Sequence, residues 1–421
     1  MISPALAIFG SLISIHATAH RPSSKAQDLT VDQVVSQAIA ASPRLRAAVL
    51  DMKAAEFGVA SARSLTNPVV TFTPGFTRAG SDEELLISQP LEISGTRSAR
   101  AGIASAEWKA TRAQAVLELR TLVSETKAAF YELSRLQGKV RLAKEHWKSS
   151  TDLEAIASRQ IQLGSRAGIE LSQIKIESTR AKQHVTLAEV EYKSKLSELN
   201  LLMGRPMAES LTTASADIQP QILGESEAIN LALIARAELD LIRARQEGYK
   251  KEASLARAEG LPDLSPHYRA ESVTREPRNG GFGVAVSLPI FDYGSRKNRI
   301  RQAETSAKAE TERLAAIQLQ IRQEVVHALA RLSAADEVVR NYRNGLLDES
   351  RKVLEASKKG YELGETNLVS LLEAQRTHRA VQIEYLDALA SLAQAQIALE
   401  RAMGSIPASL LPTPDRKEVS Q

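Results

Sequence analysis

Two segments of this chain run for nearly seventy residues without a proline. They are residues 96–163 and 295–363, and each contains only two glycines. At about 1.5 Å per residue, an uninterrupted helix of that length would reach roughly 100 Å, which is several times the diameter of a small domain. A helix of this kind cannot fold back into an ordinary globular core. The sequence therefore predicts a tall bundle or tube of long helices.

Each long segment follows a strand-like run that ends at a proline and a glycine. "AVSLPIFDYGSRKNRIRQAE" contains Pro289 and Gly294, and "SQPLEISGTRSARAGIASAE" contains Pro90 and Gly95 at positions 199 residues earlier. Proline cannot donate to a strand ladder, and glycine permits a sharp bend in the backbone. We therefore predict that these four residues form two junctions at which a strand gives way to a helix.

The repeated layout indicates an internal duplication. The glycines at the far turns, Gly164 and Gly364, keep almost the same offset as the junctions, 200 residues. Several landmarks that share nearly one offset favour a duplication over chance. The predicted segments are a signal peptide (1–19), a first repeat (29–204, hairpin about 69–91), a linker (205–225), a second repeat (226–404, hairpin about 264–290) and a C-terminal tail (405–421).

Helical patterns surround the hairpins. The leading helices are predicted from Leu29 to about Ser64 and from Ser226 to about Ala258, and a return helix is predicted over 165–203. The last helix carries two neighbouring apolar seams, one of them rich in alanine, so it can pack against a partner on each side. This pattern favours a closed ring of helices. An ordinary coiled coil of two or three strands, which needs one seam, is the alternative.

The N-terminus resembles a secretory signal peptide. Residues 5–15 are an apolar run, and Ala17-Thr18-Ala19 provides a site of the small-x-small type. An apolar tail or a misassigned start codon is the alternative interpretation. No other stretch reaches 18 consecutive apolar residues, so we expect no transmembrane helix.

Four short runs alternate between apolar and polar or small residues. In the last of them, Val284 and Val286 alternate with Ala285 and Ser287. Runs of about 8–11 residues with this alternation are typical of tilted strands that cross a bilayer. The four runs are "VVTFTPGFT" (69–77), "ELLISQPL" (84–91), "HYRAESV" (267–273) and "GFGVAVSLPI" (281–290). The predicted fold class is therefore mainly α with a membrane β-barrel.

Four strands cannot cross a membrane alone. The N–H and C=O groups on the outer edges of such a sheet would be unpaired in hydrocarbon, which costs several kcal/mol for each group. The sheet must therefore close by joining copies of itself. This requirement predicts a ring-shaped oligomer.

The junctions "QPLEISGTR" and "LPIFDYGSR" and the turn "YELGETNLVSLLEAQ" resemble the TolC family of outer-membrane efflux proteins, over about residues 29–404. Among its branches the chain is most similar to the CzcC-like cation-efflux proteins. The resemblance implies a homotrimer in the outer membrane of a Gram-negative bacterium, with a twelve-stranded barrel continued by a long α-helical barrel in the periplasm. It also implies a periplasmic adaptor (a membrane fusion protein) and an inner-membrane pump of RND type as partners.

The resemblance also assigns functional residues at the far turns. It places Glu170, Ser370 and Glu373 at the pore constriction. It places the adaptor contact at the periplasmic turns: Gly164, Arg166, Gly364, Glu365 and Thr366. The alternatives are that the turns have no partner and that the glutamates lie on a solvated outer surface.

Composition excludes several other classes of protein. The chain has no cysteine, so disulfides, thiolate metal sites and a lipid-modified N-terminal cysteine are excluded. The net charge is only +4, with basic and acidic residues interspersed, so no nucleic-acid partner is indicated. No motif indicates a catalytic residue, a cofactor or a metal site. The remaining rival is a soluble periplasmic scaffold or adaptor, which would explain the long helices but not the four strand-like runs.

Overall fold

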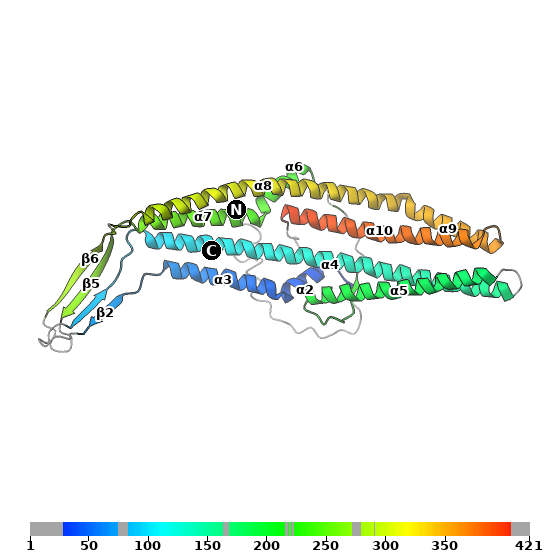
Figure 1. The fold of residues 1–421 in the computed structure, drawn as a ribbon, viewed down its shortest axis with the longest axis horizontal. Helices are drawn as coiled ribbons and strands as arrows, with labels where there is room; N and C mark the ends of the chain where they lie inside the picture. The colour runs from blue at the N-terminus through cyan, green and yellow to red at the C-terminus, as the bar shows by residue number, and fades with distance from the viewer. Residues whose placement is uncertain are drawn as a thin grey trace, which may run out of the picture. The chain divides into compact units, whose positions relative to one another are not determined.

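The computed structural model describes residues 28–74, 83–162, 168–214, 218, 220, 223–271, 279–289 and 291–405. Helices make up most of this part of the chain, with two β-hairpins between them (Figure 1). The predicted signal peptide (1–19), the first far turn with Gly164 and Arg166, and the predicted tail beyond 405 lie outside the described residues.

The chain forms two compact units. The sheet unit consists of Arg46–Leu117 and Arg236–Gln320. The turn unit consists of the chain up to Leu45, Glu118–Ala235 and the chain from Ile321 onward. Each unit thus combines segments of both predicted repeats, and the repeat boundaries themselves remain a prediction.

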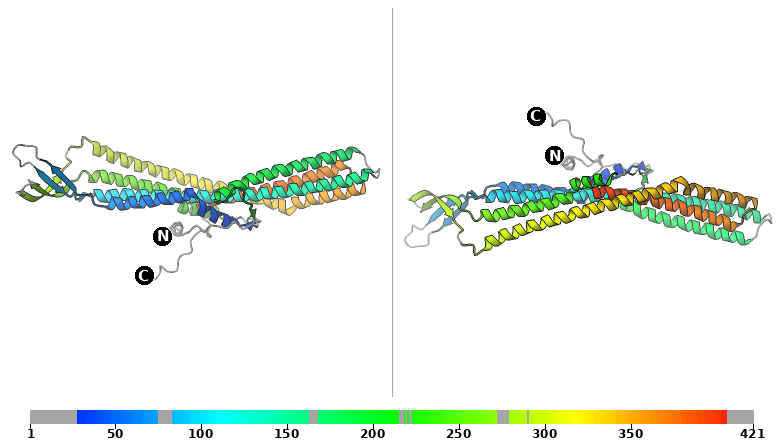
Figure 2. Two further views of the ribbon diagram at one scale, coloured as in Figure 1. Left: turned by 90° about the horizontal axis from the view of Figure 1, so that it is seen from below. Right: turned by 90° about the horizontal axis from the view of Figure 1, so that it is seen from above.

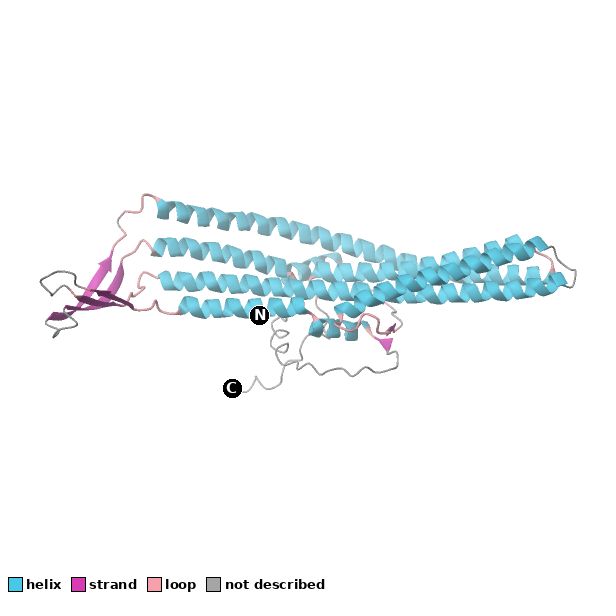
Figure 3. Cartoon of the chain, turned by 60° about the horizontal axis from the view of Figure 1, so that its bottom comes forward, coloured by secondary structure: helices cyan, strands magenta, loops and turns pink. Residues whose placement is uncertain are grey.

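The sheet unit contains one antiparallel sheet of four strands, in the order β2-β3-β5-β6. Its strands are β2 (Val69–Thr73), β3 (Glu84–Ser88), β5 (Asp263–Glu271) and β6 (Asn279–Ser287). A short loop joins each strand to one of the helices α3, α4, α7 and α8 (Figure 3). The two predicted hairpins are therefore present, and the second strand of the first pairs with the first strand of the second.

The third strand extends beyond the alternating run that indicates it. That run begins at His267, whereas β5 begins at Asp263, close to the predicted hairpin start of about 264, and includes Pro266. The carbonyl oxygen of Pro266 accepts from the Gln89 N–H at 3.0 Å, so the donor that Pro266 lacks would have faced the end of β3. One donor is therefore missing opposite Gln89, and the pairing resumes at Leu91, whose N–H donates to the Leu264 carbonyl oxygen at 2.8 Å.

The helices are long and mostly as predicted. They are α2 (Val31–Ala41), α3 (Pro43–Arg63), α4 (Thr96–Gln162), α5 (Gly168–Leu202), α6 (Glu225–Ala235), α7 (Ala237–Ala258), α8 (Ser295–Asn341), α9 (Leu347–Leu363) and α10 (Leu368–Met403). In the described part of the chain, none of these helices combines the length and the apolar character that spanning a membrane requires.

The prediction of one continuous leading helix in each half is wrong. Pro43 starts a new helix because the residue before a proline is held out of the helical region. Ser42 accordingly has φ −65° and ψ 117°, and its hydroxyl accepts from the Leu45 N–H at 3.3 Å. Arg236 has the same extended conformation, with φ −66° and ψ 118°, without a proline after it.

The prediction of an uninterrupted helix is confirmed for the described part of the first long segment and is wrong for the second. α4 continues for 67 residues. The second segment is divided into α8 and α9 by a π-helix at Tyr342–Leu346.

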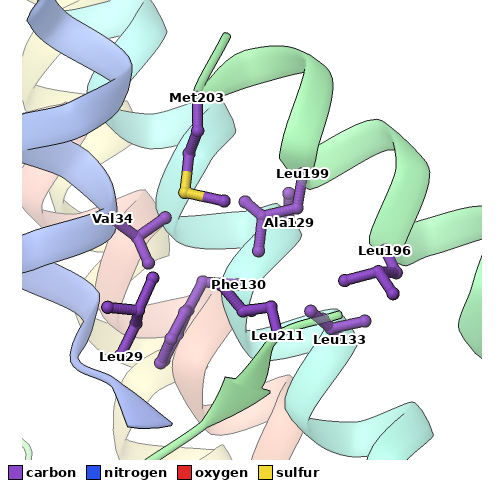
Figure 4. Packing of buried hydrophobic residues seen from close by; sticks show 9 residues of the cluster. All are labelled: Leu29, Val34, Ala129, Phe130, Leu133, Leu196, Leu199, Met203 and Leu211. Carbon is purple, nitrogen blue, oxygen red and sulfur yellow. The ribbon is translucent and has the colours of Figure 1, made fainter. Parts of the chain in front are cut away.

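The turn unit is held together by apolar side chains between helices. At one level, Phe130 and Leu133 of α4 pack with Leu199 of α5 (Figure 4). The same cluster includes a residue of α2, one of the two-residue strand β1 (Asp28–Leu29), and Leu211, which directly precedes the two-residue strand β4 (Thr212–Thr213). Nearer the far turns, α4, α5, α9 and α10 lie side by side (Figure 2). They share a second cluster: Leu153, Ala157, Ile174, Tyr361, Leu368 and Leu371.

Candidate functional site

The register of the sheet places apolar residues of all four strands on one face. Val70 pairs with Ile87, Ile87 with Tyr268, and Tyr268 with Phe282. Two further rows repeat this arrangement: Phe72, Leu85, Ala270 and Gly280 in one, and Pro266 and Val284 in the other. Side chains of paired residues lie on the same side of a sheet. The alternation in the sequence therefore corresponds to a single apolar surface.

The opposite face of the sheet is polar. Arg269 of β5 lies between two carboxylates, at 2.9 Å from Glu84 and 3.7 Å from Glu271. The imidazole of His267 covers Gly283, where a Cβ atom would meet the ring nitrogen. A sheet with one apolar and one charged face is suited to separate lipid from water.

The first junction ties the start of α4 to the end of α3. Gly95 has φ +89°, a conformation that side chains other than glycine rarely adopt. Arg97 donates to the carbonyl oxygen of Arg63 at 2.6 Å, and Arg100 donates to those of Ala62 and Ser64. The two arginine side chains thus cap the C-terminal end of α3 by donating hydrogen bonds to its last carbonyl groups.

The second junction uses a carboxylate. Gly294 has φ +84°, and the preceding residue Tyr293 is also left-handed, with φ +49°. The Asp292 carboxylate accepts from the N–H groups of Gly294 at 3.1 Å and Arg296 at 3.3 Å. The Gly294 bond is the main reason that the pKa of Asp292 lies below its usual value. Arg296 in turn donates to the Pro289 carbonyl oxygen at 3.1 Å.

Each helix begins directly after its junction glycine, so Thr96 and Ser295 are the first residues of α4 and α8. The carbonyl groups of Gly95 and Gly294 accept the first helical bonds, from the N–H groups of Ala99 and Asn298.

The far turn of the second half is a tight, left-handed reversal. Gly364 has φ +78°, and the Gly360 carbonyl oxygen accepts from the N–H groups of Glu365 at 2.8 Å and Thr366 at 3.2 Å. This is the usual way in which a glycine ends a helix. Glu365 is exposed, whereas Thr366 is half-buried and donates its hydroxyl to Ser357.

An asparagine that the sequence reasoning missed starts the next helix. The Asn367 side chain accepts from the Ser370 N–H at 2.8 Å and from the Ser370 hydroxyl at 2.9 Å. Asparagine is one of the preferred residues at this position, so the signal was present in "GETNLVS". Ser370 therefore supports the helix cap, and it lies on the same exposed side of α10 as Glu373.

Glu170 is less exposed than Ser370 and Glu373. It is half-buried near the start of α5, where its carboxylate accepts from the Tyr361 hydroxyl at 3.4 Å. Tyr361 is only 2% exposed and belongs to the cluster that α4, α5, α9 and α10 share. The pore role of Glu170, Ser370 and Glu373 stays a prediction.

A buried polar group between α4, α5 and α10 was also missed. Glu177 is 7% exposed and pairs with Arg376 at 3.1 Å, with His146 at 3.9 Å on its other side. Burial is the main cause that lowers the pKa of His146, and nearby Arg379 adds to it while Glu177 opposes it. A cavity of about 160 Å³ adjoins this group. Each of these residues stands alone in a helical pattern, so no sequence signal joins them.

Comparison with known proteins agrees with this architecture. The family model described as "Outer membrane efflux protein" matches residues 34–205 and 228–405. The cobalt-zinc-cadmium resistance protein CzcC of Cupriavidus metallidurans is 28% identical over 91% of this chain and 92% of its own. The nickel-cobalt-cadmium resistance protein NccC of Alcaligenes xylosoxydans is 22% identical over 72% of this chain and 70% of its own.

A solved structure has the same fold. The crystal structure of CusC superposes with a TM-score of 0.76, at 17% identity, over 92% of this chain and 96% of its own. The resemblance found in the junctions and the far turn is thereby confirmed. The chain belongs to the outer membrane efflux protein family and is an outer-membrane efflux channel.

Proposed function

We propose that this channel is a homotrimer that passes divalent metal cations out of the cell, as the outer-membrane part of a three-component export system. The observation that carries the proposal is the one-sided sheet with two open edges. In the described residues, β2 pairs only with β3, and β6 pairs only with β5. Pairing of β6 with β2 of the next copy would satisfy both edges, and three copies would close a barrel of twelve strands.

The two faces of the sheet give this barrel its orientation. The apolar surface with Val70, Phe282 and Val284 would face lipid, because these side chains are 63%, 91% and 62% exposed in the single chain. The charged face with Arg269 and Glu84 would line the water-filled interior. This arrangement is the one expected of a membrane barrel.

The far turns are the proposed site of the adaptor. Gly364 reverses the chain between packed helices and leaves Glu365 exposed. The residues proposed to meet a periplasmic adaptor are Gly164, Arg166, Gly364, Glu365 and Thr366. An inner-membrane pump of RND type would deliver the substrate to this end.

Metal cations are the proposed substrate because the relatives CzcC and NccC are named for resistance to cobalt, zinc, nickel and cadmium. In a trimer, Glu170 and Glu373 would contribute six carboxylates near the far turns, with Ser370 beside them. A narrow opening lined by carboxylates favours cations over anions.

Glu170→Gln and Glu373→Gln should each lower the preference for cations. Glutamine keeps the size of glutamate and can still accept from the Tyr361 hydroxyl, so the packing of Tyr361 is preserved. The measurement is the reversal potential of the purified channel in a planar bilayer under a salt gradient. The effect should be largest at low salt, where screening is weak.

Glu189→Gln is the matched control. Glu189 lies on the same helix as Glu170, about 28 Å away at roughly 1.5 Å per residue. Its removal should leave the selectivity unchanged. An unchanged ratio of cation to anion permeability in the Glu170→Gln, Glu373→Gln double variant would refute the acidic constriction.

A further inference from the structure

The two long helical segments differ in length by one residue. The junction landmarks Pro90 and Pro289 are 199 positions apart, whereas the turn glycines Gly164 and Gly364 are 200 apart. The second segment therefore has one residue more than the first between its junction and its turn. In a regular α-helix one additional residue rotates everything after it by about 100°.

The structure shows where this residue is absorbed. The chain from Tyr342 to Leu346 is a π-helix, and the Leu347 N–H donates to the Tyr342 carbonyl oxygen, five residues back. A π-helical turn holds one more residue than an α-helical turn. At the corresponding level of the first half, α4 is a regular α-helix throughout.

Residues beyond the π-helix are back in phase with the first half. Ser150 and Ser350 are 200 positions apart, and both are buried, at 2% and 8% exposed, so each faces the interior of the helix packing. The insertion is thus confined to the π-helix and does not disturb the helix after it.

The π-helix is attached to α10 by two hydrogen bonds from neighbouring residues. The Tyr342 hydroxyl donates to Glu384 at 3.1 Å, and the Arg343 guanidinium donates to the Tyr385 hydroxyl at 3.0 Å. The rings of Tyr342 and Tyr385 also meet, with centroids 6.1 Å apart.

The next two residues of α10, Leu386 and Asp387, contact α4. Asp387 pairs with Arg135 at 2.8 Å. Leu386 packs against Gly138, where a Cβ atom would lie 2.9 Å from its methyl group, so α10 approaches α4 closely at this level. Four consecutive residues of α10 thus fix α4 and the π-helix at one height.

The π-helix lies outside the buried core. None of its five residues is buried. Further along, α9 is anchored by Tyr361 in the cluster shared by four helices. A segment with few buried contacts and solvent-exposed hydrogen bonds opens at low free energy compared with a packed helix.

We propose that the π-helix is a hinge between α8 and α9, and that the Tyr342–Glu384 and Arg343–Tyr385 hydrogen bonds are the latch that keeps it closed. The first half has no counterpart of this hinge within its described helix α4, so the second half bends where the first stays rigid. The role of this bending in opening the far end rests on the proposed function. The hinge itself does not.

Hydrogen exchange of the full-length protein tests the hinge without reference to assembly. Backbone amides of 342–350 should exchange at least about tenfold faster than those of 142–150. Deleting Gly345 removes the additional residue and should slow the exchange of 342–350 to the level of α4. Equal exchange in the two wild-type segments, or no change on deletion, would overturn the proposal.

The latch has its own variants, which remain decisive if the deletion does not fold. Tyr342→Phe keeps the ring and removes the hydroxyl, and Arg343→Gln removes the guanidinium. Together they should speed exchange in 342–350 and leave 142–150 unchanged. Faster exchange in both segments would mean general destabilisation and would count against a latch.

Spin labels then measure the motion in the assembled channel. The chain has no cysteine, so single labels can be placed at Val353→Cys in α9 and Leu187→Cys in α5, where the native side chains are 53% and 60% exposed. The latch variants should broaden the distances between copies at 353 and leave those at 187 unchanged. Identical distributions at 353 in an assembled trimer would contradict the hinge. A protein that stays monomeric by mass would contradict the proposed function instead, and the exchange result would still stand.

Discussion

Replacing Val284 by arginine should abolish most of the assembled channel in the outer membrane. Val284 lies in the middle of β6 on the apolar face, opposite Pro266. An arginine facing lipid near the midplane of the bilayer costs about 2–4 kcal/mol in each subunit, and a trimer would carry three. The measurement is the amount of heat-stable oligomer recovered from outer membranes in detergent.

Ala285→Arg is the matched control, one residue further along the same strand. Ala285 pairs with Ser265 on the polar face, so an arginine there points to water. It should assemble nearly as well as the wild type. Equal yields of the Val284 and Ala285 variants would show that the two faces of the sheet have been assigned wrongly.

Phe130→Ala should lower the free energy of unfolding by about 3–5 kcal/mol, since truncating a buried phenylalanine leaves a cavity that the surroundings fill only in part. Phe130 is 1% exposed and lies at the centre of the cluster that joins α4, α5, α2, the strand β1 and Leu211 (Figure 4). Urea titration of the purified protein, followed by circular dichroism, measures the loss.

Two variants bracket this result. Phe130→Leu keeps an apolar side chain at the site and should lose clearly less stability than the alanine variant. Phe57→Ala removes a ring that is 73% exposed, so it should change stability by no more than about 0.5 kcal/mol. A small effect of Phe130→Ala would mean that this cluster does not hold the turn unit together.

The parts of the fold that depend on local chemistry could be predicted from the sequence. Pro90, Gly95, Pro289 and Gly294 mark real transitions from strand to helix, because a missing donor and a left-handed backbone leave few alternatives. The alternation around Val284 likewise predicted one apolar face. These signals act over a few residues, so they can be read without the tertiary structure.

The remaining features depend on contacts that are distant in the sequence. The helix break at Arg236 is not followed by a proline, so no local signal indicates it. The group of His146, Glu177 and Arg376 is assembled from three helices. The π-helix could be predicted only in part. Its additional residue is visible as a change of offset, but the offset alone does not say that it lies at Tyr342–Leu346.

The proposed function is tested most directly by the rate at which living cells lose metal. Cells that lack this chain but keep the proposed adaptor and pump would be loaded with labelled zinc, cobalt or cadmium and transferred to metal-free medium. We expect that these cells retain the metal, that the wild-type chain restores its loss, and that the Val284→Arg variant does not. Equally fast loss of all three metals with and without the chain would contradict its proposed role in metal efflux.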